Sequence, residues 1–96
     1  MLYSILMLDK PGATKLRDEN QSAHRDYVGK HLYNMRMGGP LMSEDGQTMI
    51  GSLIIKEFND RKEAEEFVAG EPYNQAELFE LVIIRPFQSI IDNAGL

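Results

Sequence analysis

The chain has 96 residues and carries ten Lys and Arg against fifteen Asp and Glu, a net charge of −5. A chain of this length forms one small domain, which excludes a multidomain enzyme, and a hydrophobic content of 43% predicts that it folds. The negative charge argues against nucleic-acid and anionic-membrane partners, and the absence of Cys excludes disulfides and thiolate chemistry.

The first part of the chain predicts a strand and then a long helix. Residues 2–8 are apolar and end at the turn signal Asp9-Lys10-Pro11-Gly12. No basic segment precedes them and no cleavage pattern follows, so we expect a buried strand rather than a signal peptide. Apolar residues recur at helical spacing from about residue 17 to residue 37, and Gly38-Gly39-Pro40 is expected to end this helix.

The middle of the chain predicts a hairpin and a second helix. Asp45-Gly46 is a turn signal between a short strand at residues 41–43 and a longer strand at residues 48–58. These two strands are therefore expected to be antiparallel neighbours. Asn59 or Asp60 can cap the second helix, which Gly70 is expected to end.

The last predicted strand covers residues 78–87 and follows a polar link over residues 71–77. It should lose its pairing at Pro86, because proline has no backbone N–H to donate. The complete order β-α-β-β-α-β favours an α+β fold, a four-stranded antiparallel sheet with two helices on one face. We expect one domain over residues 1–96, in which residues 88–96 form a C-terminal tail.

The first and last strands are apolar on both faces. Side chains alternate along a strand, and residues 2–8 place Tyr3 and Ile5 on one face but Leu2 and Leu6 on the other. Helices on one face leave the second face uncovered, so we predict a homodimer packed through sheet faces or edge strands. The longest uncharged stretch, residues 46–55, is too short to cross a bilayer, and a cytoplasmic protein is expected.

Histidines and carboxylates remain as candidates for chemistry. His24 and His31 lie seven residues apart, roughly 10 Å along a helix axis, so they cannot chelate one ion and no metal site is expected. Either histidine alone is typical of a partly buried imidazole with one hydrogen bond, and we keep this interpretation for His31. In Glu71-Pro72-Tyr73 the proline holds the backbone of Glu71 extended, which suits either a loop anchor or a binding site.

Short motifs are distributed along almost the whole chain. They are Leu2-Tyr3, Asp9-Lys10, His24, Gly39-Pro40, Gly51, Phe58, Ala64, Phe67, Glu71-Pro72-Tyr73 and Arg85-Pro86-Phe87. Each motif is weak alone, but their order and spacing together resemble the YciI-like (YCII-related) family of small bacterial proteins. The resemblance implies a ferredoxin-like fold of the dimeric α/β-barrel type, in agreement with the predicted elements.

The resemblance also implies an active-site pair, formed by a His of the first helix and an Asp in an Asp-Pro-aromatic loop. The matching positions are His24 and Glu71, so Glu replaces Asp and its side chain is one methylene longer. Relatives often carry Arg three residues before the His, where this chain has Gln21; Arg17 lies two turns before His24 on nearly the same helix face. The residues expected to bind substrate are Arg17, Tyr27 and Tyr73.

Two functions remain open at this point. In the first, Glu71 orients the imidazole of His24, which moves a proton to or from an unknown organic substrate, as in an isomerase or lyase without cofactor or metal. In the second, the pair is a structural hydrogen bond in a non-catalytic, dimeric ligand-binding or accessory protein. A cofactor-free oxygenase has only a similar fold shape in its favour.

Overall fold

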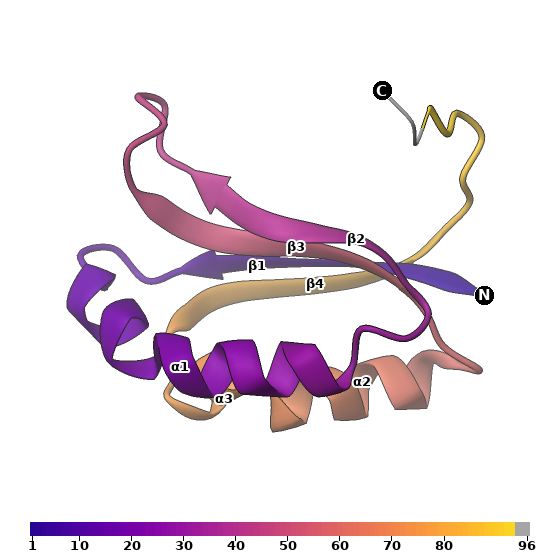
Figure 1. The fold of residues 1–96 in the computed structure, drawn as a ribbon, viewed down its shortest axis with the longest axis horizontal. Coiled ribbons are helices and arrows are strands. Elements are labelled where there is room, and N and C mark those ends of the chain that lie inside the picture. The colour runs from indigo at the N-terminus through magenta and orange to yellow at the C-terminus, as the bar shows by residue number, and fades with distance from the viewer. Residues whose placement is uncertain (94–96) are drawn as a thin grey trace.

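A computed structural model describes residues 1–93 and has the predicted order of strands and helices along the chain, with one additional short helix (Figure 1). The elements are β1 (Leu2–Asp9), α1 (Thr14–Lys30), β2 (Met35–Met42), β3 (Met49–Glu57), α2 (Arg61–Gly70), α3 (Pro72–Gln75) and β4 (Phe79–Phe87). The strands form one antiparallel sheet in the order β2-β3-β1-β4, and the helices lie on one side of it. The predicted α+β, ferredoxin-like fold is confirmed.

The central strand β1 provides the middle of the core. Its alternate residues Tyr3, Ile5 and Met7 point to the helices and are buried. Ile5 pairs with Ile54 of β3 and with Ile84 of β4, so one apolar surface extends across three strands. α2 packs its own apolar residues on this surface, which fixes the position of the chain that follows α2.

The first helix ends earlier than the sequence predicts, at Lys30 instead of near residue 37. A turn follows in which Asn34 has a φ of 62°, and Gly38-Gly39-Pro40 then lies inside β2. The prediction that this segment ends the helix, and that the second strand covers only residues 41–43, is wrong. β2 is an edge strand, where Pro40 is tolerated because one side of the strand needs no donor.

Two further expectations about proline differ from the structure. The predicted link over residues 71–77 contains α3, which begins at Pro72, where the fixed φ of proline favours a helix start. Pro86 does not end the pairing of β4, since it lies opposite Tyr3 and Phe87 lies opposite Leu2. β4 is the second edge strand, so the missing N–H of Pro86 again costs no sheet hydrogen bond.

The two predicted turn and cap signals are confirmed. Gly46 has a φ of 72° in the hairpin between β2 and β3, a conformation that favours glycine. Asp60 caps α2, because its side chain accepts a hydrogen bond of 3.0 Å from the backbone N–H of Glu63.

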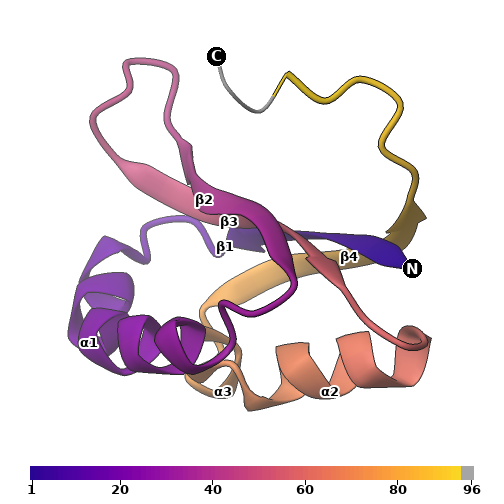
Figure 2. The ribbon, with the colours of Figure 1, turned by 45° about the vertical axis from the view of Figure 1, so that its right-hand side comes forward.

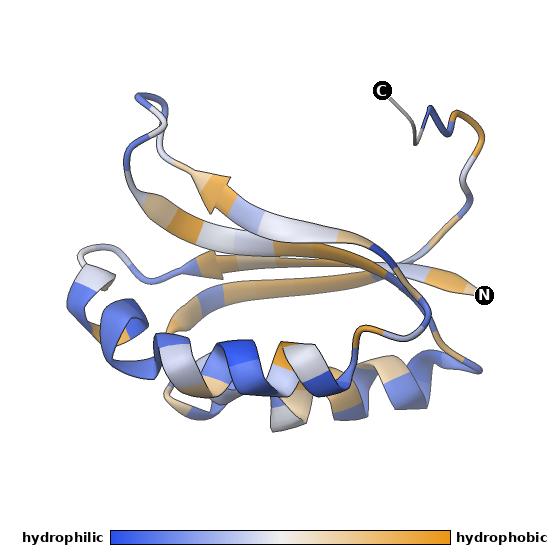
Figure 3. Cartoon of the chain, in the orientation of Figure 1, coloured by the Kyte–Doolittle hydropathy of each residue, from blue (hydrophilic) through white to orange (hydrophobic). Residues whose placement is uncertain are grey.

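Among residues 1–93, no helix covers the sheet surface opposite α1, α2 and α3, and we call this surface the open sheet face. It carries Leu2, Leu6, Leu8, Leu53, Ile55, Leu81 and Ile83. Figure 3 shows the apolar character of the strands beside the mainly polar helices. Residues 88–93 extend on the same side as this face (Figure 2), where Arg36 and Asp92 form an ion pair of 2.8 Å.

The predicted tail continues to residue 96, and residues 94–96 lie outside the described residues. Within residues 1–93, no helix has the length and apolar character needed to cross a membrane.

Lys56 of β3 is a buried cation on the helix side of the sheet. Its side chain is 2% exposed, and its Nζ donates a hydrogen bond of 2.7 Å to the backbone oxygen of Tyr33. Burial lowers the pKa of Lys56 below the ordinary 10.5, and the negative charge of Glu63 offsets only part of this effect. Folding therefore disfavours the protonated form of this side chain.

We expect this burial to make the effect of Lys56→Met depend on pH. Below the lowered pKa, Lys56 is protonated in both the folded and the unfolded state, and the full free-energy cost of burying its charge opposes folding. Between the lowered pKa and 10.5, only the unfolded state keeps the proton, so the wild-type unfolding free energy rises with pH. In urea denaturation from about pH 7 upward, the unfolding free energy of the wild type should rise relative to that of Lys56→Met. The exposed Lys62→Met is the control, and a constant difference for Lys56→Met would contradict the prediction.

Candidate functional site

A cavity of about 450 Å³ lies between α1 and β2 on the helix side of the sheet. From α1 it is lined by His24 and Val28, from β2 by Met35 and Gly38, and from α3 by Tyr73. Most of the lining is apolar, with a small number of polar side chains, which is the usual composition of a small-molecule site.

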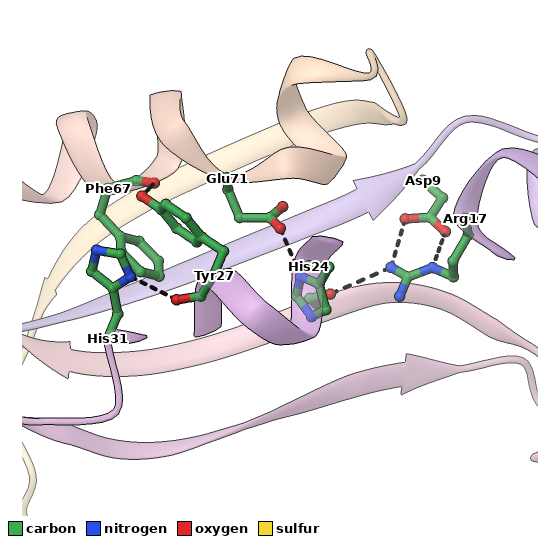
Figure 4. A network of polar contacts seen from close by, with 8 residues as sticks. Asp9, Arg17, His24, Tyr27, His31, Phe67 and Glu71 are labelled. Atoms are coloured by element: carbon green, nitrogen blue, oxygen red, sulfur yellow. Dashed lines mark hydrogen bonds and ion pairs between the residues drawn. The ribbon is translucent and has the colours of Figure 1, made fainter. Parts of the chain in front are cut away.

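His24 and Glu71, the pair implied by the family resemblance, are in direct contact. The Nδ1 atom of His24 lies 2.6 Å from Oε1 of Glu71 (Figure 4). The Glu71 side chain is 1% exposed, whereas the His24 side chain is 20% exposed and lines the cavity. The arrangement places an ionisable ring at the cavity wall with a buried carboxyl group behind it.

The backbone on both sides of Glu71 fixes this carboxyl group in place. Glu71 ends α2 and begins α3, with φ −70° and ψ 126°. Its N–H donates to the oxygen of Val68 at 3.1 Å, and its own oxygen accepts from the N–H of Gln75 at 3.0 Å. Pro72 favours this extended conformation at the preceding residue. Two helix ends therefore hold one side chain.

The contact determines which nitrogen of His24 can react. A carboxylate only accepts hydrogen bonds, so with Glu71 ionised the Nδ1 of His24 carries the hydrogen and Nε2 has the free lone pair. Within residues 1–93 the second oxygen of Glu71, Oε2, is buried without a hydrogen-bond partner. The negative charge of Glu71 is thus directed mainly at the imidazole.

Tyr73 forms a flat wall beside the pair. Its ring stacks on the ring of His24 with a centroid distance of 4.2 Å and an angle of 17°. The guanidinium carbon of Arg17 lies 4.5 Å from the centroid of the same ring. Burial raises the pKa of Tyr73, the cation of Arg17 opposes this, and the charge of Glu71 adds to it. The hydroxyl group therefore stays protonated at neutral pH.

Arg17 is held by a buried ion pair with Asp9. Its Nε donates to one carboxylate oxygen of Asp9 at 2.7 Å and its Nη2 to the other at 3.0 Å, while Nη2 also reaches the hydroxyl of Ser52 at 3.3 Å (Figure 4). Burial acts to lower the pKa of Arg17, but the hydrogen bonds and charge of Asp9 outweigh it, and the pKa is raised. The guanidinium charge is thus already paired before any ligand binds.

The structure brings three of the predicted site residues to the cavity with His24, or directly behind it, and places the fourth elsewhere. Arg17 and Tyr73 line the cavity, and Glu71 lies behind His24. Tyr27 instead lines a second cavity of about 430 Å³, and its hydroxyl donates to the backbone oxygen of Phe67 at 2.7 Å.

His31 is hydrogen-bonded to the backbone, as the sequence predicted. Its Nδ1 lies 2.7 Å from the backbone oxygen of Tyr27. In Figure 4 the contacts of His31, Tyr27 and Phe67 form a group separate from those of His24. Among residues 1–93, no three His or acidic side chains are grouped closely enough to hold a metal ion.

Sequence reasoning missed Asp9 and Ser52 as parts of the site. Asp9 was assigned only to a turn, although it follows a buried strand and can reach into the core from the strand end. Ser52 lies on the inward side of β3 together with Ile54 and the buried Lys56. Polar residues at inward positions of a strand were the available signal, because a buried polar group needs a partner.

The chain belongs to the YCII-related domain family, whose model matches residues 1–88. In structure it is similar to 5-chloro-2-hydroxyhydroquinone dehydrochlorinase (TftG) from Burkholderia phenoliruptrix AC1100, solved in complex with 2,5-dihydroxybenzoquinone. The two chains share 30% identity with a TM-score of 0.86, over 92% of this chain and 94% of that chain.

The chain also shares its fold with Rv0793 from Mycobacterium tuberculosis, at 14% identity and a TM-score of 0.50, over 97% of each chain. No curated protein matches the sequence.

The buried ion pair of Asp9 and Arg17 should have a large effect on the unfolding free energy when only one partner is removed. Asp9→Ala leaves the cation of Arg17 buried without its carboxylate, so we expect a loss of about 3 to 5 kcal/mol of unfolding free energy in urea denaturation. The double variant Asp9→Leu/Arg17→Met should recover most of this loss.

The exposed pair of Lys15 and Glu19 provides the control, because its atoms are 3.9 Å apart in solvent. Lys15→Ala should cost less than about 1 kcal/mol. Equal losses for Asp9→Ala and Lys15→Ala would show that the buried pair has no special role.

Proposed function

We propose that this protein is a small-molecule enzyme in which His24 and Glu71 act together as a general acid–base pair. The observation that carries the proposal is the 2.6 Å contact between His24 Nδ1 and a buried carboxylate, on a ring that lines the cavity. A carboxylate in this position orients the imidazole and stabilises its protonated form. Membership of the YCII-related family and the similarity to a dehydrochlorinase support an enzymatic role.

The proposed chemistry follows from the two nitrogens of His24. Nδ1 keeps its hydrogen and its bond to Glu71, and Nε2 removes a proton from the bound substrate. The imidazolium formed in this way gains an ion pair with Glu71. If a leaving group departs from the substrate as Nε2 takes the proton, a double bond forms in the substrate and the reaction is that of a lyase. If Nε2 returns the proton to another carbon, the reaction is that of an isomerase.

The lining of the cavity favours a flat, oxygen-bearing ring as the substrate. The ring of His24, which stacks on Tyr73 and is 20% exposed, presents a flat surface to the cavity, and most other lining residues are apolar. The charge of Arg17 is already paired with Asp9, and Arg25, which also lines the cavity, adds a second cation that can attract an ionised oxygen on the ring. The similar dehydrochlorinase was solved with a dihydroxybenzoquinone, a ligand of this class. We therefore propose a hydroxylated hydroquinone or quinone.

The central test is the turnover of a chlorinated hydroxyhydroquinone, measured as chloride release. His24→Gln removes the proton-accepting nitrogen, so we expect kcat to fall by roughly 100- to 10,000-fold while binding of 2,5-dihydroxybenzoquinone persists. The matched control is His31→Gln, which changes a histidine of the same chain outside the cavity and should leave kcat within about threefold.

Glu71→Gln separates catalysis from a structural hydrogen bond. The variant keeps the shape and can still bond His24, but it cannot stabilise an imidazolium by charge. A structural role predicts unchanged turnover in a folded variant, which would favour the ligand-binding alternative. The acid–base role predicts a fall of at least roughly 100-fold in kcat.

We further propose that the protein forms a homodimer through the open sheet face. This face presents leucine and isoleucine side chains with no helix over them, and Leu81 is 43% exposed. The segment of residues 88–93 extends on the same side (Figure 2), and its Ile90 and Ile91 are 84% and 82% exposed. A second copy of the chain would remove this apolar surface from water.

Sedimentation at micromolar concentration tests the dimer. We expect a species of twice the chain mass of 10.9 kDa, and Leu81→Lys should weaken association by at least about tenfold because it buries an unpaired charge. Glu66→Lys, an exposed change on α2, should leave the dimer intact. A wild-type chain that sediments as a stable monomer would contradict the proposal.

A further inference from the structure

We infer that Gly38 determines how large a ring the cavity admits beside His24. The inference rests on the proposed function, because it concerns the substrate range of the same cavity. Gly38 lies in β2 on the wall of the cavity opposite α1, which carries His24. What matters at this position is the side chain that glycine lacks.

The sheet register fixes the direction in which a side chain at position 38 would point. Gly38 lies opposite Ile54 of β3, and residues opposite each other in an antiparallel pair project from the same face. Ile54 is buried on the helix side and lines the cavity. A Cβ atom on residue 38 would lie 3.5 Å from Cγ1 of Ile54 and 3.4 Å from Sδ of Met35, another cavity residue. It would therefore enter the cavity.

The backbone at this position does not itself require glycine. Among the described residues, the glycines with positive φ are Gly12 and Gly46, so Gly38 has a conformation that other residues adopt. The distances of 3.4 and 3.5 Å are ordinary contacts, so an added methyl group also meets no clash. Glycine inside a strand weakens it, because it has more backbone entropy to lose and no side chain to pack. We infer that Gly38 offsets this cost by leaving open space in the cavity above the edge strand β2.

The neighbouring glycine provides a matched control. Gly39 lies opposite Leu53, whose side chain belongs to the open sheet face. A Cβ atom there would meet nothing within 4 Å. Gly39 also lines the cavity, but through its backbone, since its Cβ would point to the other face of the sheet. Substitutions at Gly38 and Gly39 therefore change the same strand by the same atoms, and those at Gly38 are the ones that place new atoms in the cavity.

The experiment compares two rings in five proteins by isothermal titration. The rings are 2,5-dihydroxybenzoquinone, with one ring, and 2-hydroxy-1,4-naphthoquinone, with two fused rings. The proteins are the wild type, Gly38→Ala, Gly38→Val, Gly39→Ala and Gly39→Val. We expect Gly38→Ala to weaken binding of the fused ring by at least about tenfold more than that of the single ring, because overfilling a packed space is costly. Gly38→Val should weaken both.

Both Gly39 variants should keep both dissociation constants within about threefold of the wild type, and circular dichroism checks that all five proteins fold. If the wild type binds the rings, but the Gly38 and Gly39 variants show the same preference between the two rings, the role of Gly38 is overturned and the proposed substrate class is not. If the wild type bound neither ring, the proposed substrate class and the inference would both be overturned. A fused ring excluded only by Gly38 substitutions would support the inference.

Discussion

The buried ion pair between Arg17 and Asp9 is the interaction on which the site depends. It joins the end of β1 to the first turns of α1, and its contact with Ser52 adds β3. The same guanidinium lies against the ring of Tyr73, which in turn stacks on His24. A buried charge is costly unless its hydrogen bonds are satisfied, and both carboxylate oxygens of Asp9 are used here. One pair thus orients two strands, one helix and the aromatic wall of the cavity.

The two pairs of ionisable side chains at the cavity, Arg17 with Asp9 and His24 with Glu71, have different roles. Asp9 neutralises Arg17, which leaves that pair as a support for Tyr73 and does not make it a strong anion site. Glu71 is directed at His24, whose ring faces the cavity. The side chain of Glu71 reaches the imidazole at hydrogen-bond distance, so a glutamate can make at this position the contact that the family resemblance implies for an aspartate.

Elements with a local signal were predictable from the sequence, and those defined by distant pairing were not. β1 and α2 have clear apolar periods, and Asp60 caps α2 as expected. The helix prediction ran past Lys30 because Leu32 and Met35 continue a helical spacing, whereas Gly38-Gly39-Pro40 carries no strand pattern and becomes a strand through its pairing with β3. His24 and Glu71 were found through the family resemblance, since 47 residues separate them along the chain. Asp9 and Ser52 were missed because their partner Arg17 is brought to them only by the fold.

The position of Glu71 between α2 and α3 couples its carboxyl group closely to the hydrophobic core. α2 is anchored by Phe67 and Val68 in the core, and the carboxyl group follows directly after its last turn. A core substitution that shifts α2 by a fraction of an ångström would move Glu71 relative to His24 by a similar amount. Folding and the proposed activity therefore depend on the same positions of α2. Variants with altered activity are expected to accumulate in this helix as well as at the cavity wall.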